Sequence, residues 1–82
     1  MYYTYVLRSM KDGKLYTGHT EDLERRIAEH NRGKVKSTAS RVPFVLVYSE
    51  TFSTRSEARW YERYLKTAWG KRYIKNRIKH SL

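Results

Sequence analysis

Residues 2–18, YYTYVLRSMKDGKLYTG, decide the fold of this chain. Residues 2–8 are rich in aromatic and β-branched side chains, which favour a pleated strand. Residues 10–13 contain the Asp-Gly pair that is typical of tight hairpin turns. Residues 14–18 then predict the returning strand. The chain is therefore expected to begin with a β-hairpin.

A helix, a loop and a third strand are expected after the hairpin. Thr20 is the expected N-cap, and acidic residues follow it in the first turn, where negative charge suits the helix dipole. The helix, about ten residues long, ends near Gly33. Residues 34–41 are polar, small and basic, which predicts a mobile loop. Residues 44–48, FVLVY, predict the most buried strand of the sheet.

Two helices complete the predicted order. Residues 54–57, TRSE, fit the capping box that begins a helix. The apolar residues at helical spacing after this box are Ala58, Tyr61, Leu65, Ala68 and Trp69. Gly70 is expected to end the helix, and residues 71–79 predict a last, basic helix with Ile74 and Ile78 facing inward. The order β-β-α-β-α-α predicts an α+β fold, in which helices flank a small, three-stranded, mostly antiparallel sheet.

Length and composition limit the class of protein. The 82 residues suffice for one domain, residues 1–82, without a second core. No apolar run reaches 18 residues, so a membrane span is not expected, and the first residues lack the pattern of a signal peptide. The absence of cysteine excludes disulfide scaffolds, thiolate zinc sites and thiol nucleophiles. A cytoplasmic location is the expectation.

The charge of the chain is strongly positive and unevenly placed. Eighteen Lys and Arg against eight Asp and Glu give a net charge of +10. Residues 63–82 contain basic residues and no acidic one. Such an excess predicts a polyanionic partner, and nucleic acid is favoured over a membrane surface because the basic segments are not strongly amphipathic. The cations expected to contact phosphates are Arg25, Lys34, Lys36, Lys71, Arg72, Lys75, Arg77 and Lys79.

Several tyrosines occur in the hairpin. Tyr3, Tyr5 and Tyr16 lie in two strands joined by a tight turn, so their phenols could converge. A phenol donates and accepts hydrogen bonds, and nearby cations make its proton easier to remove. Taken alone, the pattern favours the simpler interpretation, in which tyrosines cover the surface of a small sheet.

Arg26 and His30 stand four residues apart on the first helix. This spacing places them about 40° apart on one face. An arginine beside a histidine is suited to holding a phosphate and stabilising its charge. The alternative is a solvated face, because Arg25 and Glu29 are close by in the sequence.

Glu62 borders the apolar stripe of the second helix instead of pointing into water. A lone carboxylate at the edge of a core in a cationic protein is suited to binding Mg²⁺, which keeps most of its waters. The alternative is an ion pair with Lys66 at i+4 or Arg59 at i−3. The sequence contains no glycine-rich phosphate loop, no HExxH and no serine elbow, nor a pair of neighbouring carboxylates for two metals. Any nuclease here would use a single metal ion.

These residues occur in an order that resembles the GIY-YIG endonuclease domain. The first motif is YTY at residues 3–5, and the second is YTG at residues 16–18, followed by the helix 21–31. A third block is EARWYE at residues 57–62. The resemblance covers nearly the whole chain, which is similar to the small single-domain bacterial members. The first motif departs from the pattern by having Tyr and Thr where the family has Gly and Ile, and residue 17 is Thr instead of an apolar β-branched residue.

The resemblance implies a set of site residues. Carried over by position, the catalytic residues are Tyr5, Tyr16, Arg26, His30 and Glu62. Glu62 is also the implied ligand of one Mg²⁺ or Mn²⁺ ion. Asn76 matches only by its rough distance from Glu62 an asparagine that some members use.

The activity implied is metal-dependent hydrolysis of phosphodiester bonds in DNA. The metal on Glu62 would polarise the scissile phosphate, Arg26 would neutralise the transition state, and Tyr5 or Tyr16 would orient or deprotonate water. The expected substrate is branched, nicked or single-stranded DNA, in repair or recombination, and RNA is a further possibility. The alternatives are a nucleic-acid-binding module without cleavage and a small interaction protein recruited to a larger complex.

Overall fold

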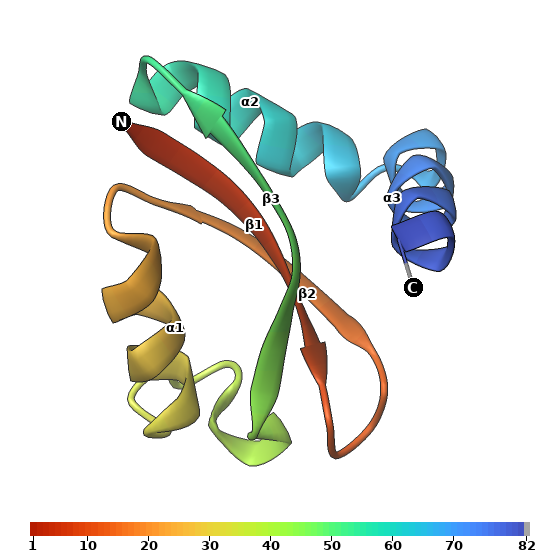
Figure 1. Cartoon of the computed structure of the whole chain (residues 1–82). Coiled ribbons are helices and arrows are strands. Elements are labelled where there is room, and N and C mark those ends of the chain that lie inside the picture. The colour runs from red at the N-terminus through yellow and green to blue at the C-terminus, as the bar shows by residue number, and fades with distance from the viewer. Residues whose placement is uncertain (82) are drawn as a thin grey trace.

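Three antiparallel strands form a sheet in which β1 (Tyr2–Ser9) lies between β2 (Leu15–Thr20) and β3 (Phe44–Phe52). The computed structural model describes residues 1–81, and the side chains of residues 1–79 (Figure 1). The elements in chain order are β1 (Tyr2–Ser9), β2 (Leu15–Thr20), α1 (Leu23–Asn31), a 3₁₀ turn (Ala39–Arg41), β3 (Phe44–Phe52), α2 (Arg55–Leu65) and α3 (Ala68–Ser81). The predicted order β-β-α-β-α-α and the antiparallel α+β fold are confirmed.

Strand β1 is the central and most buried strand, so the prediction for residues 44–48 was wrong. Strand β3 lies at an edge of the sheet, and its Val45 and Leu46 are 44% and 42% exposed. In contrast, four consecutive residues of β1, Thr4 to Leu7, are fully buried. A strand between two others with helices on both faces must bury both rows of side chains. An apolar run in β3 does not reveal that only one of its edges is paired.

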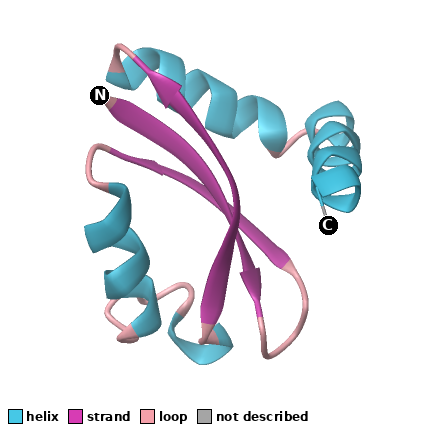
Figure 2. Cartoon of the chain, in the orientation of Figure 1, coloured by secondary structure: helices cyan, strands magenta, loops and turns pink. Residues whose placement is uncertain are grey.

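Helices cover both faces of the sheet (Figure 2). Because side chains alternate along a strand, Tyr5 and Leu7 pack toward α1 while Val6 packs toward α2 and α3. The predicted inward side chains of α3, Ile74 and Ile78, are buried beside Val6. Within residues 1–81, no helix is long and apolar enough to cross a bilayer.

Local details at the first helix and its loop differ from the predictions. The N-cap of α1 is Asp22, whose side chain accepts a hydrogen bond from the Arg25 N–H at 3.1 Å. Thr20 instead accepts from the Asp22 N–H. The segment 34–41, predicted as a mobile loop, contains the 3₁₀ turn and the fully buried Thr38. Thr38 anchors it to the core through His30, and the Arg41 carbonyl accepts a hydrogen bond from Ser9 Oγ at 2.6 Å.

The boundary between α2 and α3 was also predicted wrongly. The Thr54–Glu57 capping box is confirmed, but α2 ends at Leu65, and Gly70 lies inside α3 instead of ending a helix. A Cβ atom at Gly70 would clash with the Tyr64 carbonyl, so the glycine allows the two helices to touch. Ala68 and Trp69 belong to α3 and are exposed, so they extend no apolar stripe from α2.

Candidate active site

Tyr5 and Gly18 face each other in the first two strands. Tyr5 is 1% exposed, and its partner in the antiparallel register is Gly18 of β2. A Cβ atom at residue 18 would lie 2.6 Å from Tyr5 Oη and 2.7 Å from Cζ. The glycine of the second motif therefore provides the space that the phenol of the first motif occupies.

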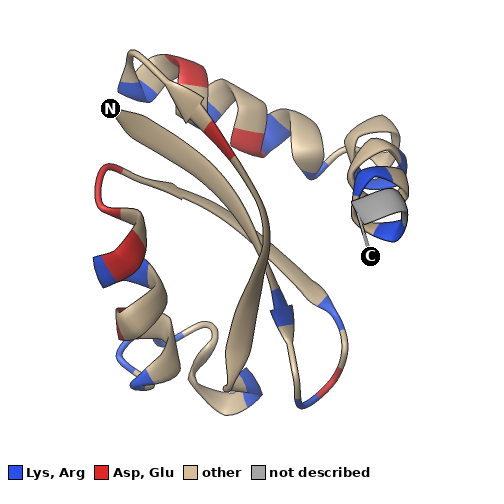
Figure 3. Ribbon diagram, in the orientation of Figure 1, with Lys and Arg blue, Asp and Glu red and all other residues tan. Residues whose placement is uncertain are grey.

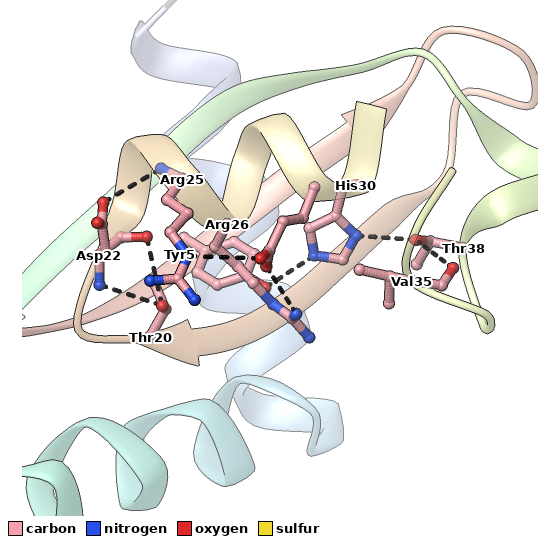
Figure 4. A network of polar contacts seen from close by, with 9 residues as sticks. Tyr5, Thr20, Asp22, Arg25, Arg26, His30, Val35 and Thr38 are labelled. Atoms are coloured by element: carbon pink, nitrogen blue, oxygen red, sulfur yellow. Dashed lines mark hydrogen bonds and ion pairs between the residues drawn. The ribbon is translucent and has the colours of Figure 1, made fainter. Parts of the chain in front are cut away.

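His30 connects this phenol to the loop after α1. Its Nε2 lies 2.9 Å from Tyr5 Oη, and its Nδ1 lies 2.8 Å from Thr38 Oγ1. The imidazole is fully buried and packs edge-on against the ring of Tyr16, with 5.1 Å between ring centroids. Figure 4 shows Tyr5, Arg26 and His30 converging, with Thr38 on the far side of the imidazole. Thr38 was missed in the sequence because no motif marks it.

The hydrogen bonds around His30 have one consistent direction. Arg26 can only donate, so Tyr5 Oη accepts from it, and the Tyr5 proton needs another acceptor. In this buried position that acceptor is His30 Nε2. Nδ1 then carries the imidazole proton and donates to Thr38 Oγ1, whose own hydroxyl donates to the Val35 carbonyl at 3.4 Å. The loop thus selects the tautomer in which Nε2 accepts a hydrogen bond from the Tyr5 hydroxyl.

Burial controls the protonation of this pair. It raises the pKa of Tyr5 to about 12, against the opposing effect of the hydrogen bond from Arg26. Burial, together with the charge of Arg26, lowers the pKa of His30. At neutral pH Tyr5 is therefore a neutral phenol, and His30 is a neutral imidazole whose Nε2 accepts the hydrogen bond of that phenol.

Arg26 and Tyr16 form the accessible part of the cluster. The Arg26 side chain is 37% exposed and contacts Glu29 Oε1 at 3.2 Å, whereas its neighbour Arg25 is 75% exposed. Tyr16 is half-buried, and its ring centroid lies 6.5 Å from that of Tyr5. Four of the five predicted catalytic residues, Tyr5, Tyr16, Arg26 and His30, therefore lie together between α1 and the hairpin.

Glu62 approaches from α2, on the other face of the sheet. Its side chain is 17% exposed, with Oε1 at 2.5 Å from His19 Nδ1 and Oε2 at 2.7 Å from Lys66 Nζ. The predicted ion pair with Lys66 is present, while Arg59 makes none among the described side chains. Burial alone would raise the pKa of Glu62, but Lys66 and His19 hold it below its ordinary value. Its charge also acts on Tyr5, raising that pKa.

His19 was missed in the sequence. It follows Gly18 in β2, and alternation along the strand turns it toward α2 while Tyr16 faces α1. The sequence feature that could have indicated it is a histidine three residues after the tyrosine of the second motif. Its partner, 43 residues away, could not be found from spacing.

The donor atoms near Glu62 fit one hydrated divalent ion. Among residues 1–79 no cluster of three or more His, Asp or Glu side chains could hold a metal by itself. Mg²⁺ binds through one or two carboxylates and completes its shell with water and substrate phosphate. Lys66, which is half-exposed, would have to release one carboxylate oxygen. The residues present therefore suit an ion that binds together with substrate.

A groove of about 840 Å³ lies between the hairpin and α3. Its floor is apolar, and its basic lining residues are Arg8, Lys14, Lys66, Lys71, Lys75 and Lys79. Figure 3 shows the basic residues along α3 and near the hairpin turn. Three of the predicted phosphate contacts, all on α3, are in this set.

The other predicted cations lie outside the groove. Arg72 stacks over Trp69, and Arg77 over Tyr48. Arg25, Lys34 and Lys36 do not line it, and neither does Asn76, which is exposed on α3. The sequence had not identified Arg8, Lys14 or Lys66 as members of this basic surface.

Comparison of the sequence with known proteins identifies its family. The sequence model of the GIY-YIG catalytic domain matches residues 1–78. The chain belongs to the GIY-YIG family. Membership implies endonuclease activity on a nucleic acid substrate.

The similar GIY-YIG relatives are small proteins named UPF0213. One from Staphylococcus haemolyticus is 51% identical over 67 residues, which cover 80% of each chain. One from Halobacterium salinarum is 46% identical over 59 residues, covering 71% of this chain and 75% of that protein. The solution NMR structure of a UPF0213 protein from Bacillus halodurans is 39% identical, with a TM-score of 0.55 over 93% of this chain and 84% of that one.

Proposed function

We propose that this GIY-YIG domain is a structure-selective DNA endonuclease that requires one Mg²⁺ or Mn²⁺ ion and acts in repair or recombination. The observation that carries the proposal is the convergence of Tyr5, Arg26 and His30 beside Tyr16, with the charge of Glu62 acting on the same phenol. A tyrosine, an arginine and a carboxylate supply the proton transfer, charge neutralisation and metal ligand that phosphodiester hydrolysis needs.

The tyrosines and His30 divide the proton transfer between them. Tyr16 is the more accessible phenol, so it orients the attacking water. Tyr5 is enclosed under Gly18 and can take up a proton only by passing its own to His30 Nε2, 2.9 Å away. The tautomer with Nδ1–H is the one that permits this transfer.

Arg26 and Glu62 act on charge. The guanidinium of Arg26, partly exposed at the mouth of the cluster, contacts the phosphoryl oxygens, where negative charge grows in the transition state. Glu62 holds the divalent ion, which when bound polarises the phosphate and stabilises the leaving oxygen. Lys66 remains near the carboxylate and can pair with the substrate phosphate once it is displaced.

One observation favours a second function. Both carboxylate oxygens of Glu62 already have cationic or imidazole partners, His19 and Lys66. If these contacts persist with nucleic acid bound, no metal binds and the domain is a nucleic-acid-binding module without cleavage. The basic charge would serve the same phosphates in either case.

A cleavage assay on a panel of labelled substrates separates these functions. Nicked, branched, single-stranded and fully paired DNA, with RNA counterparts, are incubated with Mg²⁺, Mn²⁺ or EDTA. Glu62→Gln is compared with the wild type and with Glu50→Gln, an exposed carboxylate on β3, the edge strand opposite β2. We expect metal-dependent cleavage that Glu62→Gln removes and Glu50→Gln retains, with DNA binding preserved. Full activity in Glu62→Gln would refute the metal mechanism, and no cleavage by the wild type on any substrate would favour the binding module.

A further inference from the structure

The groove between the hairpin and α3 has one wall of evenly spaced lysines. Lys71, Lys75 and Lys79 follow each other at intervals of four residues on α3, so their Cα atoms rise by about 6 Å per step. Ile74 and Ile78 fix this face of the helix by packing into the core. The interval is comparable to the distance between successive phosphates of one extended nucleic acid strand.

The opposite wall is the unpaired edge of the sheet. Strand β2 pairs only with β1, so its outer edge at Leu15, Tyr16 and Thr17 opens into the groove. Tyr16 belongs both to this wall and to the candidate active site. The Tyr16 ring packs against His30 on the α1 side of the sheet, whereas α3 covers the other side, so Tyr16 marks where the open edge of β2 passes from the groove to the candidate active site.

Electrostatics and size define the occupant. Among residues 1–79, six cations line the groove and no acidic residue does. The domain measures only 27 × 26 × 21 Å, so a duplex, nearly as wide as the domain, cannot enter a groove between two of its elements. A single strand can. At one end Lys66 connects the groove to Glu62.

We propose that this groove binds one unpaired strand of nucleic acid, with its phosphates on the α3 lysines and its path leading over the open edge of β2 to the candidate active site. This inference rests on the proposed function, because it assigns the path by which the substrate strand reaches the site. The substrate is then DNA or RNA with an unpaired segment beside the cleaved bond. Lys14 of the hairpin and Arg8 complete the path on the side opposite α3.

The test is binding measured without cleavage. Fluorescence anisotropy in EDTA follows an oligothymidylate of about 15 nucleotides, a length within the range of single-strand binding sites, and a duplex of equal length. The variant K71Q/K75Q/K79Q removes three lining charges. The matched variant R32Q/R59Q/R63Q removes three exposed arginines that do not line the groove. Circular dichroism melting curves for both variants ensure that folded proteins are compared.

Each phosphate contact on a single strand contributes about 0.7 to the slope of log affinity against log salt. The groove variant should therefore lose about 2 from the slope and roughly 100-fold in affinity at about 0.1 M salt. The arginine variant should lose less than half as much. Equal losses in the two variants, or duplex bound more tightly than the single strand, would overturn the proposal.

An acidic peptide is the rival occupant, because an extended chain can also pair with an open strand edge. A fluorescent peptide of alternating Glu and Val is the probe for it. If the groove variant loses this peptide and still binds the oligonucleotide normally, the groove is a protein-docking site and the proposal fails.

The groove proposal and the nuclease proposal can fail separately, because binding is measured in EDTA, where no cleavage occurs. A wild type that binds through the groove in EDTA and never cleaves when metal is added refutes only the proposed nuclease activity. If the groove variant cleaves and binds DNA as the wild type does, only the claim that the groove binds the substrate strand is refuted.

Discussion

Replacing Gly18 with Ala introduces a methyl group where the Tyr5 phenol lies. The added Cβ would be 2.6 Å from Oη and 2.7 Å from Cζ, against at least 3.4 Å in ordinary contact. The hydroxyl would have to retreat by about 0.8 Å. Tyr5 is enclosed and hydrogen-bonded to His30 at 2.9 Å, so the ring cannot move without disturbing that bond.

The size of the effect follows from three contributions. Overpacking a buried site costs about 1–3 kcal/mol, and weakening a buried hydrogen bond adds about 1 kcal/mol. Alanine regains about 0.5–1 kcal/mol because it is less flexible than glycine in a strand. The free energy of unfolding should therefore fall by about 1–3 kcal/mol in Gly18→Ala. Cleavage should fall further than stability accounts for, because the Tyr5 to His30 geometry is lost.

Urea denaturation followed by circular dichroism measures the loss, and a nicking assay under conditions where the variant is folded measures activity. Gly33→Ala is the matched control, since a Cβ there meets nothing within 4 Å and only its positive φ of 74° is strained. It should lose about 1 kcal/mol and no activity. In the double variant with Tyr5→Phe, the Oη clash disappears and the Cζ contact remains, so part of the stability should return. A Gly18→Ala protein with wild-type stability and activity would refute the packing argument.

Two further variants test the cluster beside Tyr5. Arg26→Ala should reduce cleavage on the order of a hundredfold or more while retaining most binding, and Arg25→Ala should weaken binding alone; the reverse pattern would mean that the register of the helix is off by one. Thr38→Val removes the acceptor of the His30 Nδ1–H hydrogen bond, so the ¹⁵N chemical shifts of the imidazole should move toward those of the other tautomer and cleavage should fall. Thr38→Ser keeps the hydroxyl and should retain both the shifts and the activity. Unchanged ¹⁵N shifts in Thr38→Val would contradict the assigned hydrogen-bond direction.

The order of elements could be predicted from the sequence, but the neighbours of each strand could not. Residue type and spacing marked the hairpin, the capping box at Thr54 and the inward isoleucines of α3, because each depends on residues close in the chain. The apolar run of β3 predicted a strand correctly and its burial wrongly. Burial depends on whether another strand pairs with its second edge, which is decided by the whole sheet. Gly70 was wrongly predicted to end a helix for the same reason. The low helix propensity of glycine is a local property, whereas the close contact with Tyr64 is made by the tertiary fold.

The candidate site also contains some residues that could be predicted from the sequence and others that could not. Arg26 and His30 could be placed on one face because four residues separate them, and the family motif selected the two tyrosines. His19 and Thr38 could not be found, since their importance comes from Glu62 and from His30, to which the fold brings them. Helical spacing left two interpretations of Glu62 open, a metal ion or an ion pair with Lys66 or Arg59, and the structure adds His19, which neither interpretation included.

The positions of the five site residues determine which experiments can isolate chemistry. Tyr5 and His30 are fully buried, so they belong to the core as well as to the site, and a change in either alters stability and proton transfer together. Arg26, Tyr16 and Glu62 keep some exposure at the border of the core, where truncation leaves a smaller cavity. A loss of cleavage in these three variants can be attributed to chemistry once folding has been measured. For the buried pair, a structural readout such as the His30 tautomer is needed, because activity alone cannot separate a displaced proton acceptor from a loosened core.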